Sequence, residues 1–389
     1  MTRGRDRGFT LIELMISLVV SSLLVGLILA IFSRMSISYR GQQQIAGVQQ
    51  VIAAARATIE LDAKQAGFEI SQGFTIAGDA TPKTIHPPVE IIDSATGPDQ
   101  IALFYADPSA QAVVTAVGAP DWISTSAVTV DSVTGFTVGG LVVMVNVNPA
   151  GLAGLGAADP TIATFDACVL QIASIAGTNL TFATTGAWGR PSSPQCTAPT
   201  LNTTMIYNFI AHAYRIDTSI DPTIPTTSDL YPSARGTLQM SPTGGLLNSA
   251  ADNWSDLAYG FTDLQAAVRF YDGDLTDQDG DADATRDWYS GPAGAALTAP
   301  QPPSPPLPLP ALQMSISLVA KTDREIEGIS TSQTPALIGA PTDYNSIGNH
   351  PSVALPAQAP WAADPLLKGA RVYRYVTFQV DLRNIGVGR

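Results

Sequence analysis

The first 67 residues carry two hydrophobic patterns, one after the other. Leu14–Phe32 is an uncharged, mainly apolar run of 19 residues, about the length that crosses a bilayer core as an α-helix. Beyond it, apolar residues recur at spacings of three, four or seven, which is typical of one face of an amphipathic helix. This stripe consists of Ile45, Val48, Ile52, Ala55, Ile59 and Ala66. Since no proline occurs before Pro82 and Gly67 is a suitable stop, we predict one helix from Phe9 to Ala66, about 87 Å long.

From Phe68 onward the pattern changes to short β-like runs separated by Gly, Pro, Asp and Asn. We expect strands at 100–105, 141–145, 168–172, 179–182, 206–216, 260–271, 313–321 and 372–382. A turn at Asp107-Pro108 is expected to end the first of them. The predicted fold class is therefore α+β. A long N-terminal α-helix, membrane-spanning in its first half and amphipathic in its second, packs on a mostly antiparallel β head.

Two long segments of the head are expected to be loops. Residues 299–312 are rich in proline, which favours extended polyproline structure and excludes this segment from a sheet interior. We interpret them as a stiff spacer between two strands. Residues 331–364, rich in Pro, Gly and Asn, are expected to form a second long loop.

Composition and charge narrow the class of protein. The formal net charge of −13 argues against a nucleic-acid partner, because binding to phosphates needs an excess of Lys and Arg. Only 14% of residues are charged, while 33 are Gly and 29 are Pro, a mixture that suits an exported, turn-rich β domain. In an oxidising compartment Cys168 and Cys196 are expected to form a disulfide; the alternative is two unrelated buried thiols.

An acidic segment near residue 280 is the strongest polar cluster of the head. Alternating carboxylates around a glycine can wrap oxygen ligands around Ca²⁺, although the spacing does not fit an EF-hand. The alternative is a solvated hairpin loop, since Asp-Gly is a strong turn signal. Both interpretations remain open at this point. The carboxylates concerned are Asp272, Asp274, Asp277, Asp279, Asp281 and Asp283.

Catalytic templates are missing from the sequence. His86, His212 and His350 lie in separate segments without metal-ligand spacing, and we interpret each as incidental. The chain has no G-x-S-x-G, no P-loop and no H-E-x-x-H. We predict that the protein is not an enzyme and requires no cofactor, with Ca²⁺ as the one ligand left open.

The residues that precede the apolar run set its orientation. Arg3, Arg5 and Arg7 form a short basic head, which predicts that the N-terminus stays in the cytoplasm and the bulk of the chain is exported. The run is longer than the apolar region of an ordinary signal peptide. Glu13 stands at its start, and a carboxylate there is costly and usually marks function.

Gly8-Phe9-Thr10-Leu11-Ile12-Glu13, followed by the apolar helix, resembles the signal of a type IV prepilin. Further segments are similar to PilW-type minor pilins: 61–68 to the end of their stem, 260–283 to a strand and acidic loop, and 373–384 to their closing strand. The resemblance implies a leader at 1–8, a stem at 9–67 with its transmembrane part at about 9–32, and a pilin-like head at 68–389. It also implies cleavage after Gly8, N-methylation of Phe9, and an assembly role for Glu13 as partner of a neighbouring Phe9 amine.

The function implied is that of a structural minor pilin, which primes pilus assembly and sits at or near the filament tip. Expected partners are other pilins and minor pilins through the N-terminal helix, a prepilin peptidase, the inner-membrane assembly platform and a PilY-type tip adhesin. The expected location is the bacterial inner membrane with the head in the periplasm, and then the pilus at the cell surface. Two alternatives remain: a J-type pseudopilin of a type II secretion system, and a membrane-anchored exported binding protein or enzyme.

Overall fold

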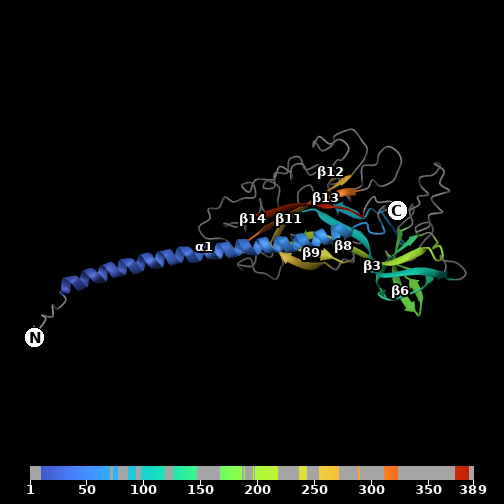
Figure 1. Ribbon diagram of the computed structural model, residues 1–389, viewed down its shortest axis with the longest axis horizontal. Helices are drawn as coiled ribbons and strands as arrows, with labels where there is room; N and C mark the ends of the chain where they lie inside the picture. The colour runs from blue at the N-terminus through green and yellow to red at the C-terminus, as the bar shows by residue number, and fades with distance from the viewer. Residues whose placement is uncertain are drawn as a thin grey trace, which may run out of the picture.

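The computed structural model shows a long helix that projects from a β-rich head (Figure 1). It describes residues 10–70, 73–77, 86–92, 98–118, 126–146, 167–185, 188, 196, 198–217, 236–242, 254–270, 288–289, 311–322 and 373–384. Within these residues the predicted α+β class is confirmed: one long helix packs against mostly antiparallel strands.

The helix, α1, runs from Leu11 to Gln65. Its second half carries the predicted apolar stripe, of which Val48, Ile52 and Ile59 are buried against the head. The strands of the head are β1 (Thr75–Ile76), β2 (Val89–Ile92), β3 (Gln100–Val117), β4 (Ala127–Val130), β5 (Leu141–Asn146), β6 (Ala167–Ala176), β7 (Asn179–Phe182), β8 (Thr204–Asp217), β9 (Thr237–Ser241), β10 (Ser255–Tyr259), β11 (Phe261–Phe270), β12 (Trp288–Tyr289), β13 (Ala311–Lys321) and β14 (Tyr373–Asp381).

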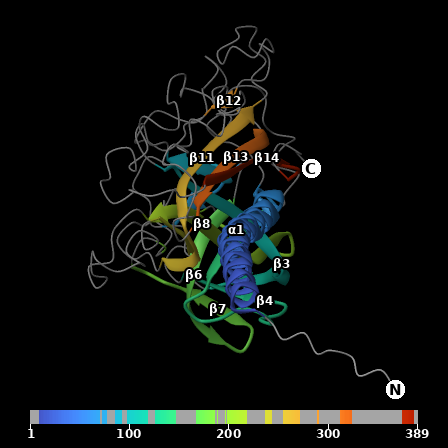
Figure 2. The ribbon, with the colours of Figure 1, turned by 90° about the vertical axis from the view of Figure 1, so that its left-hand side faces the viewer.

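The described strands form two sheets. The larger has the order β10-β9-β8-β5-β6-β7-β4-β3-β2, with β1 added in parallel to β6. The smaller has the order β12-β11-β13-β14 and is antiparallel throughout. The stem helix lies against both. Its buried stripe shares one hydrophobic core with residues of β2, β3, β8 and β9 on one side and of β11, β13 and β14 on the other (Figure 2).

Part of the larger sheet closes on itself. Six strands follow one another by pairing in the order β8-β5-β6-β7-β4-β3. The two end strands, β3 and β8, also pair with each other, so the six strands form a closed antiparallel ring. A separate core fills this ring, and its members include Val114, Val142, Leu170, Leu180 and Phe182. The sequence did not predict this ring, because its closure depends on pairing between strands far apart in the chain. We call it the distal barrel, since Figure 1 shows it beyond the C-terminal end of α1.

The predicted turn at Asp107-Pro108 is wrong. Strand β3 continues through it to Val117, and the register against β8 shifts between Asp107 and Gln111. Proline is tolerated at a bulge because no ladder hydrogen bond is needed from it there. The Asp107 carboxylate accepts from the N–H and Oγ of Ser109 at 2.8 and 2.6 Å, and so satisfies polar groups that leave the ladder. The bulge lets one long strand serve both the main sheet and the distal barrel.

Other boundaries differ more modestly. The predicted strand at 260–271 is preceded by β10, and Gly260 separates β10 from β11 with a φ of +89°, which favours glycine. Residues 311 and 312, expected within the proline-rich loop, begin β13 instead. The rest of that loop and the second expected loop, 331–364, lie outside the described residues.

Candidate functional site: the stem helix

The start of α1 is closed by a reciprocal capping box. The backbone N–H and the Oγ1 of Thr10 donate to Oε2 of Glu13 at 3.0 and 2.9 Å, and the Glu13 N–H donates to Oγ1 of Thr10 at 3.3 Å. Two of the helix's unpaired N-terminal donors are thereby satisfied. The spacing Thr10-x-x-Glu13 is the sequence signature of such a cap. Glu13 therefore has a structural contact within its own chain.

From Leu11 to Phe32 the helix offers an apolar surface to its surroundings on every side. The large apolar side chains of this segment are between 49% and 79% exposed. Among the described residues α1 is the one helix long and apolar enough to cross a membrane. Length and composition alone are weak support, because a signal sequence has the same properties.

A buried carboxylate joins the second half of α1 to the head. Asp62 is 6% exposed and accepts from the hydroxyl of Tyr105 on β3 at 3.0 Å. On β8, the Tyr214 hydroxyl also donates to it, and Nδ1 of His212 lies 2.7 Å from Oδ2. We call these four residues the Asp62 cluster. It holds the stem to the main sheet by hydrogen bonds as well as by apolar packing.

The Asp62 cluster also sets the ionisation of its members. Burial raises the pKa of Asp62, but the hydrogen bonds and charge of His212 and the hydroxyls of Tyr214 and Tyr105 outweigh it, so the pKa lies below its ordinary value. Burial and the Asp62 charge raise the pKa of both tyrosines. Asp62 is therefore an anion that accepts from neutral hydroxyls. This corrects the interpretation of His212 as incidental, because its ring is a structural partner of the stem.

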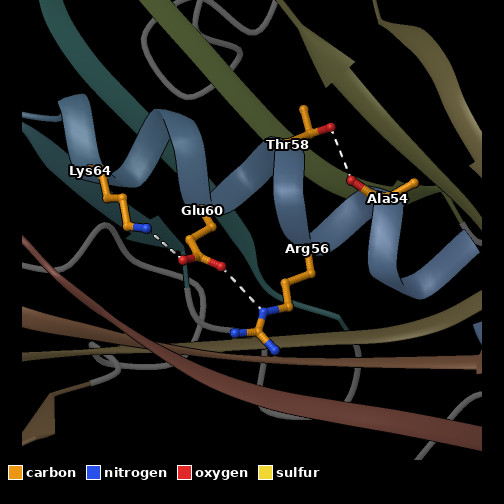
Figure 3. A network of polar contacts seen from close by, with 5 residues as sticks. All are labelled: Ala54, Arg56, Thr58, Glu60 and Lys64. Carbon is orange, nitrogen blue, oxygen red and sulfur yellow. Dashed lines mark hydrogen bonds and ion pairs between the residues drawn. The ribbon is translucent and has the colours of Figure 1, made fainter. Parts of the chain in front are cut away.

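A polar network runs along the docked half of α1 (Figure 3). Glu60 accepts from Nζ of Lys64 at 2.7 Å and from Nε of Arg56 at 3.3 Å. The hydrogen bond of Lys64 is the main cause that lowers the pKa of Glu60. Because these pairs are exposed to solvent, we expect each to add little to the stability of the helix. The Arg56 guanidinium also lies 5.2 Å from the ring centroid of Phe378, which ties this side of α1 to β14.

The last described residues of the chain close the other end of the helix. Nδ2 of Asn384 donates to the carbonyl oxygens of Lys64 at 3.0 Å and Gln65 at 3.3 Å, in the last turn of the helix. The Gln65 carbonyl also accepts from the N–H of Phe68 at 3.0 Å. Gly67 follows with a φ of +83°, the left-handed conformation in which a helix commonly ends at glycine. Gly67 is the predicted stop of the helix, whereas no local sequence signal indicates the cap from Asn384, which is distant in sequence.

The two cysteines are joined. A disulfide links Cys168 on β6 to Cys196, with 5.5 Å between their Cα atoms. Both residues are buried in the core of the distal barrel. The bond therefore fastens the segment that leads into β8 to the wall of the barrel.

Several predicted site residues cannot be placed. Gly8 and Phe9 precede the first described residue, and all six carboxylates of the acidic segment fall within residues 271–287, outside the described part of the chain. Among the residues that the structure does describe, no group of three or more His, Cys, Asp or Glu could hold a metal ion. His86, also interpreted as incidental, places Nδ1 3.0 Å from Oε1 of Glu90, so its role is structural as well.

The comparison with protein families bears on the same end of the helix. A model of the prokaryotic N-terminal methylation motif matches residues 3–29. The chain carries a prepilin-type N-terminus. No curated protein and no solved structure matches it significantly.

The matched motif and the position of the helix support the same general class of protein. The matched residues include Glu13 and most of the exposed apolar segment, so the protein is type IV pilin- or pseudopilin-like, and the motif suggests a structural role. The exposed helix and the motif are together compatible with membrane anchoring and with a place in a pilus.

Proposed function

We propose that the protein is a minor type IV pilin of the PilW type, which primes pilus assembly and sits at or near the filament tip. The observation that carries the proposal is the position of Glu13. It lies in the first turn of a helix whose apolar surface is exposed from Leu11 to Phe32, and it is one of the residues that match the methylation motif. A surface of that size needs an apolar environment, first the lipid and then the stems of neighbouring subunits.

The chemistry of Glu13 suits such an assembly. A carboxylate among packed apolar helices is costly unless a cation accompanies it. The backbone N–H and the Oγ1 of Thr10 both donate to Oε2 of Glu13, which leaves Oε1 for another donor. Cleavage after Gly8 by a prepilin peptidase would create an amine on Phe9, and the Phe9 amine of a neighbouring subunit would supply that donor. The capping box then fixes the rotamer of Glu13 before the neighbour arrives.

The shape of the head supports a position at the tip. The distal barrel lies beyond the C-terminal end of α1, on the side away from the exposed apolar segment (Figure 1). In a filament whose stems pack along its axis, this barrel points away from the membrane. Other minor pilins, the inner-membrane assembly platform and a PilY-type adhesin are the partners that we propose. The protein would wait in the inner membrane with its head in the periplasm, and then leave with the pilus.

The proposal is tested by three single variants in a strain that lacks the native gene. Gly8→Ala should abolish leader removal, seen as a heavier band on an immunoblot, and should abolish surface pili. Glu13→Ala should keep leader removal and still reduce the number of pili at least tenfold by electron microscopy. Thr10→Ala is the matched control, because it breaks the capping box but keeps the carboxylate, and pili should remain within about twofold of wild type.

The other outcomes identify the rival functions. If Gly8→Ala and Glu13→Ala leave processing and surface function unchanged, the filament proposal fails in favour of a membrane-anchored exported binding protein or enzyme. The methylation motif is equally compatible with a pseudopilin. A J-type pseudopilin predicts that Glu13→Ala blocks the release of secreted enzymes and leaves piliation intact, and that secretion-system genes lie next to this one.

A further inference from the structure

Two arginines stand between the exposed apolar segment and the head. Arg34 and Arg40 are exposed, and Tyr39 beside them is 62% exposed. Neither arginine has a hydrogen-bond or ion-pair partner among the residues that the structure describes. Although the chain has a formal net charge of −13, these two guanidinium groups are therefore available to pair with anions from outside the protein.

The helix geometry fixes their depth. At 1.5 Å per residue, Leu11–Phe32 is about 33 Å long and fills a hydrocarbon core of about 30 Å. Arg34 then lies about 3 Å beyond Phe32, and Arg40 about 12 Å beyond it. The headgroup layer extends roughly 5–8 Å past the core. Because helical side chains lean toward the N-terminus, the Arg40 guanidinium points back into that layer.

The three side chains point in different directions around the helix axis. This arrangement suits lipid headgroups that surround the helix, because a partner on one side of the helix would reach only some of them. With about 100° between successive residues, Arg34, Tyr39 and Arg40 point in three directions separated by roughly 100–140°. The first buried residue of α1, Gly41, comes directly after them, so the head begins where the headgroup layer ends. Tyrosine is favoured at this level because its ring is apolar and its hydroxyl reaches water.

We propose that Arg34, Tyr39 and Arg40 form a headgroup collar, a binding site for the phosphate groups of anionic phospholipids on the head side of the membrane. The arginines pair with lipid phosphates, and Tyr39 marks the depth of the interface. The collar fixes the depth of the stem and holds the head directly above the bilayer. This inference needs the stem to cross a membrane, but it does not depend on the pilin role, because it concerns the protein before any assembly.

The test uses the full chain in nanodiscs that contain equal amounts of phosphatidylcholine and phosphatidylglycerol. Native mass spectrometry counts the lipids that stay bound when the protein is released from the disc. Wild type should retain phosphatidylglycerol in preference to phosphatidylcholine. Arg34→Gln/Arg40→Gln should lower this preference by roughly fivefold for each arginine removed. The basic residues before Gly8 are the same in wild type and in the variant, so any lipids that they bind contribute equally to both measurements.

A charge-matched control removes two other arginines. Arg56→Gln/Arg383→Gln changes the net charge by the same amount, at one site in the docked half of α1 and one site after β14, and it should keep the wild-type preference. Arg34→Lys/Arg40→Lys should keep at least half of it, because the charge remains. Equal retention of the two lipids by wild type, an unchanged preference in Arg34→Gln/Arg40→Gln, or an equal loss in the control would each overturn the collar. The test does not measure pili. A negative result would therefore reject the headgroup collar without bearing on the proposed pilin function.

Discussion

Nδ1 of His212 lies 2.7 Å from Oδ2 of Asp62, so an imidazole on strand β8 holds a carboxylate of the stem helix across 150 residues of sequence. The same carboxylate accepts from the hydroxyls of Tyr105 and Tyr214. Three side chains of the main sheet thus converge on one helix residue. This arrangement makes the attachment of stem to head sensitive to a single substitution.

Asp62→Ala should lower the free energy of unfolding by about 3 kcal/mol, because it leaves the buried hydroxyls and the imidazole without an acceptor. Tyr105→Phe, which removes one donor and keeps the acceptor's other partners, should cost about 1 kcal/mol. Urea unfolding of the full chain in detergent, followed by tryptophan fluorescence, measures both. Tyr39→Phe, on an exposed tyrosine, serves as the control and should lie within about 0.5 kcal/mol of wild type. Equal effects of Asp62→Ala and Tyr39→Phe would show that the cluster adds no stability.

The head should lose stability in acid through Asp62. Its pKa is lowered on folding, so the stability it provides is complete above its ordinary value of 3.8 and is lost as the pH falls through the lower folded value. The difference in unfolding free energy between wild type and Asp62→Asn should therefore shrink below that pH. A difference that stays constant down to about pH 2 would contradict this assignment.

At alkaline pH the stability of the head should fall because the tyrosines of the Asp62 cluster ionise in the unfolded chain. The pKa values of Tyr105 and Tyr214 are raised above 10.0, so their contribution is complete below that pH and is lost above it, where the unfolded chain ionises first. Unfolding free energies measured between about pH 8 and about pH 11 should fall more steeply for wild type than for Tyr105→Phe/Tyr214→Phe. Parallel curves for the two proteins would exclude the tyrosines as the cause.

Loss of the disulfide should destabilise the distal barrel. The bond closes a loop with a sequence separation of 28, for which chain entropy gives a stabilisation of about 3–4 kcal/mol. Cys168→Ala/Cys196→Ala should show this loss in urea unfolding under oxidising conditions. Wild type treated with a reductant should then unfold close to the double variant, and an unchanged midpoint after reduction would argue against a structural bond.

The acidic segment allows a direct choice between its two interpretations. A calcium loop predicts that millimolar Ca²⁺ raises the Tm of the full chain and that the same concentration of Mg²⁺ does so less, because Mg²⁺ demands stricter geometry. An acidic turn predicts no shift with either ion. Asp279→Asn/Asp281→Asn should remove a calcium-dependent rise, which separates this segment from other carboxylates of the head.

The parts of the fold that the sequence predicted are those with a local cause. The stripe of α1 is visible because its period matches the helix and its members are buried together. Asp62 could have been found in the same way, since it follows Ile59 by three positions and precedes Ala66 by four, on the buried side. A carboxylate on an apolar stripe indicates a buried partner, although not which one.

The parts that escaped prediction depend on contacts between distant segments. Strand β3 passes Asp107-Pro108 because β8 continues beside it, and no local signal reveals that partner. The distal barrel closes only through the pairing of β3 with β8, and its core is assembled from six separate strands. The donors to Asp62 likewise come from β3 and β8, whose approach to the helix follows from the whole sheet.

The cap that Asn384 places on Lys64 and Gln65 sets an order of events during synthesis. These contacts join residues 320 and 319 positions apart, and β14 just before them also covers the stem. The stem is made before the strands that cover it, and its docking surface is complete only once residues 373–384 have been made. A chain that stops early leaves Val48, Ile52 and Ile59 partly uncovered. A chain without residues 373–384 would therefore lack both the Asn384 cap and the part of the stem's core that β14 supplies.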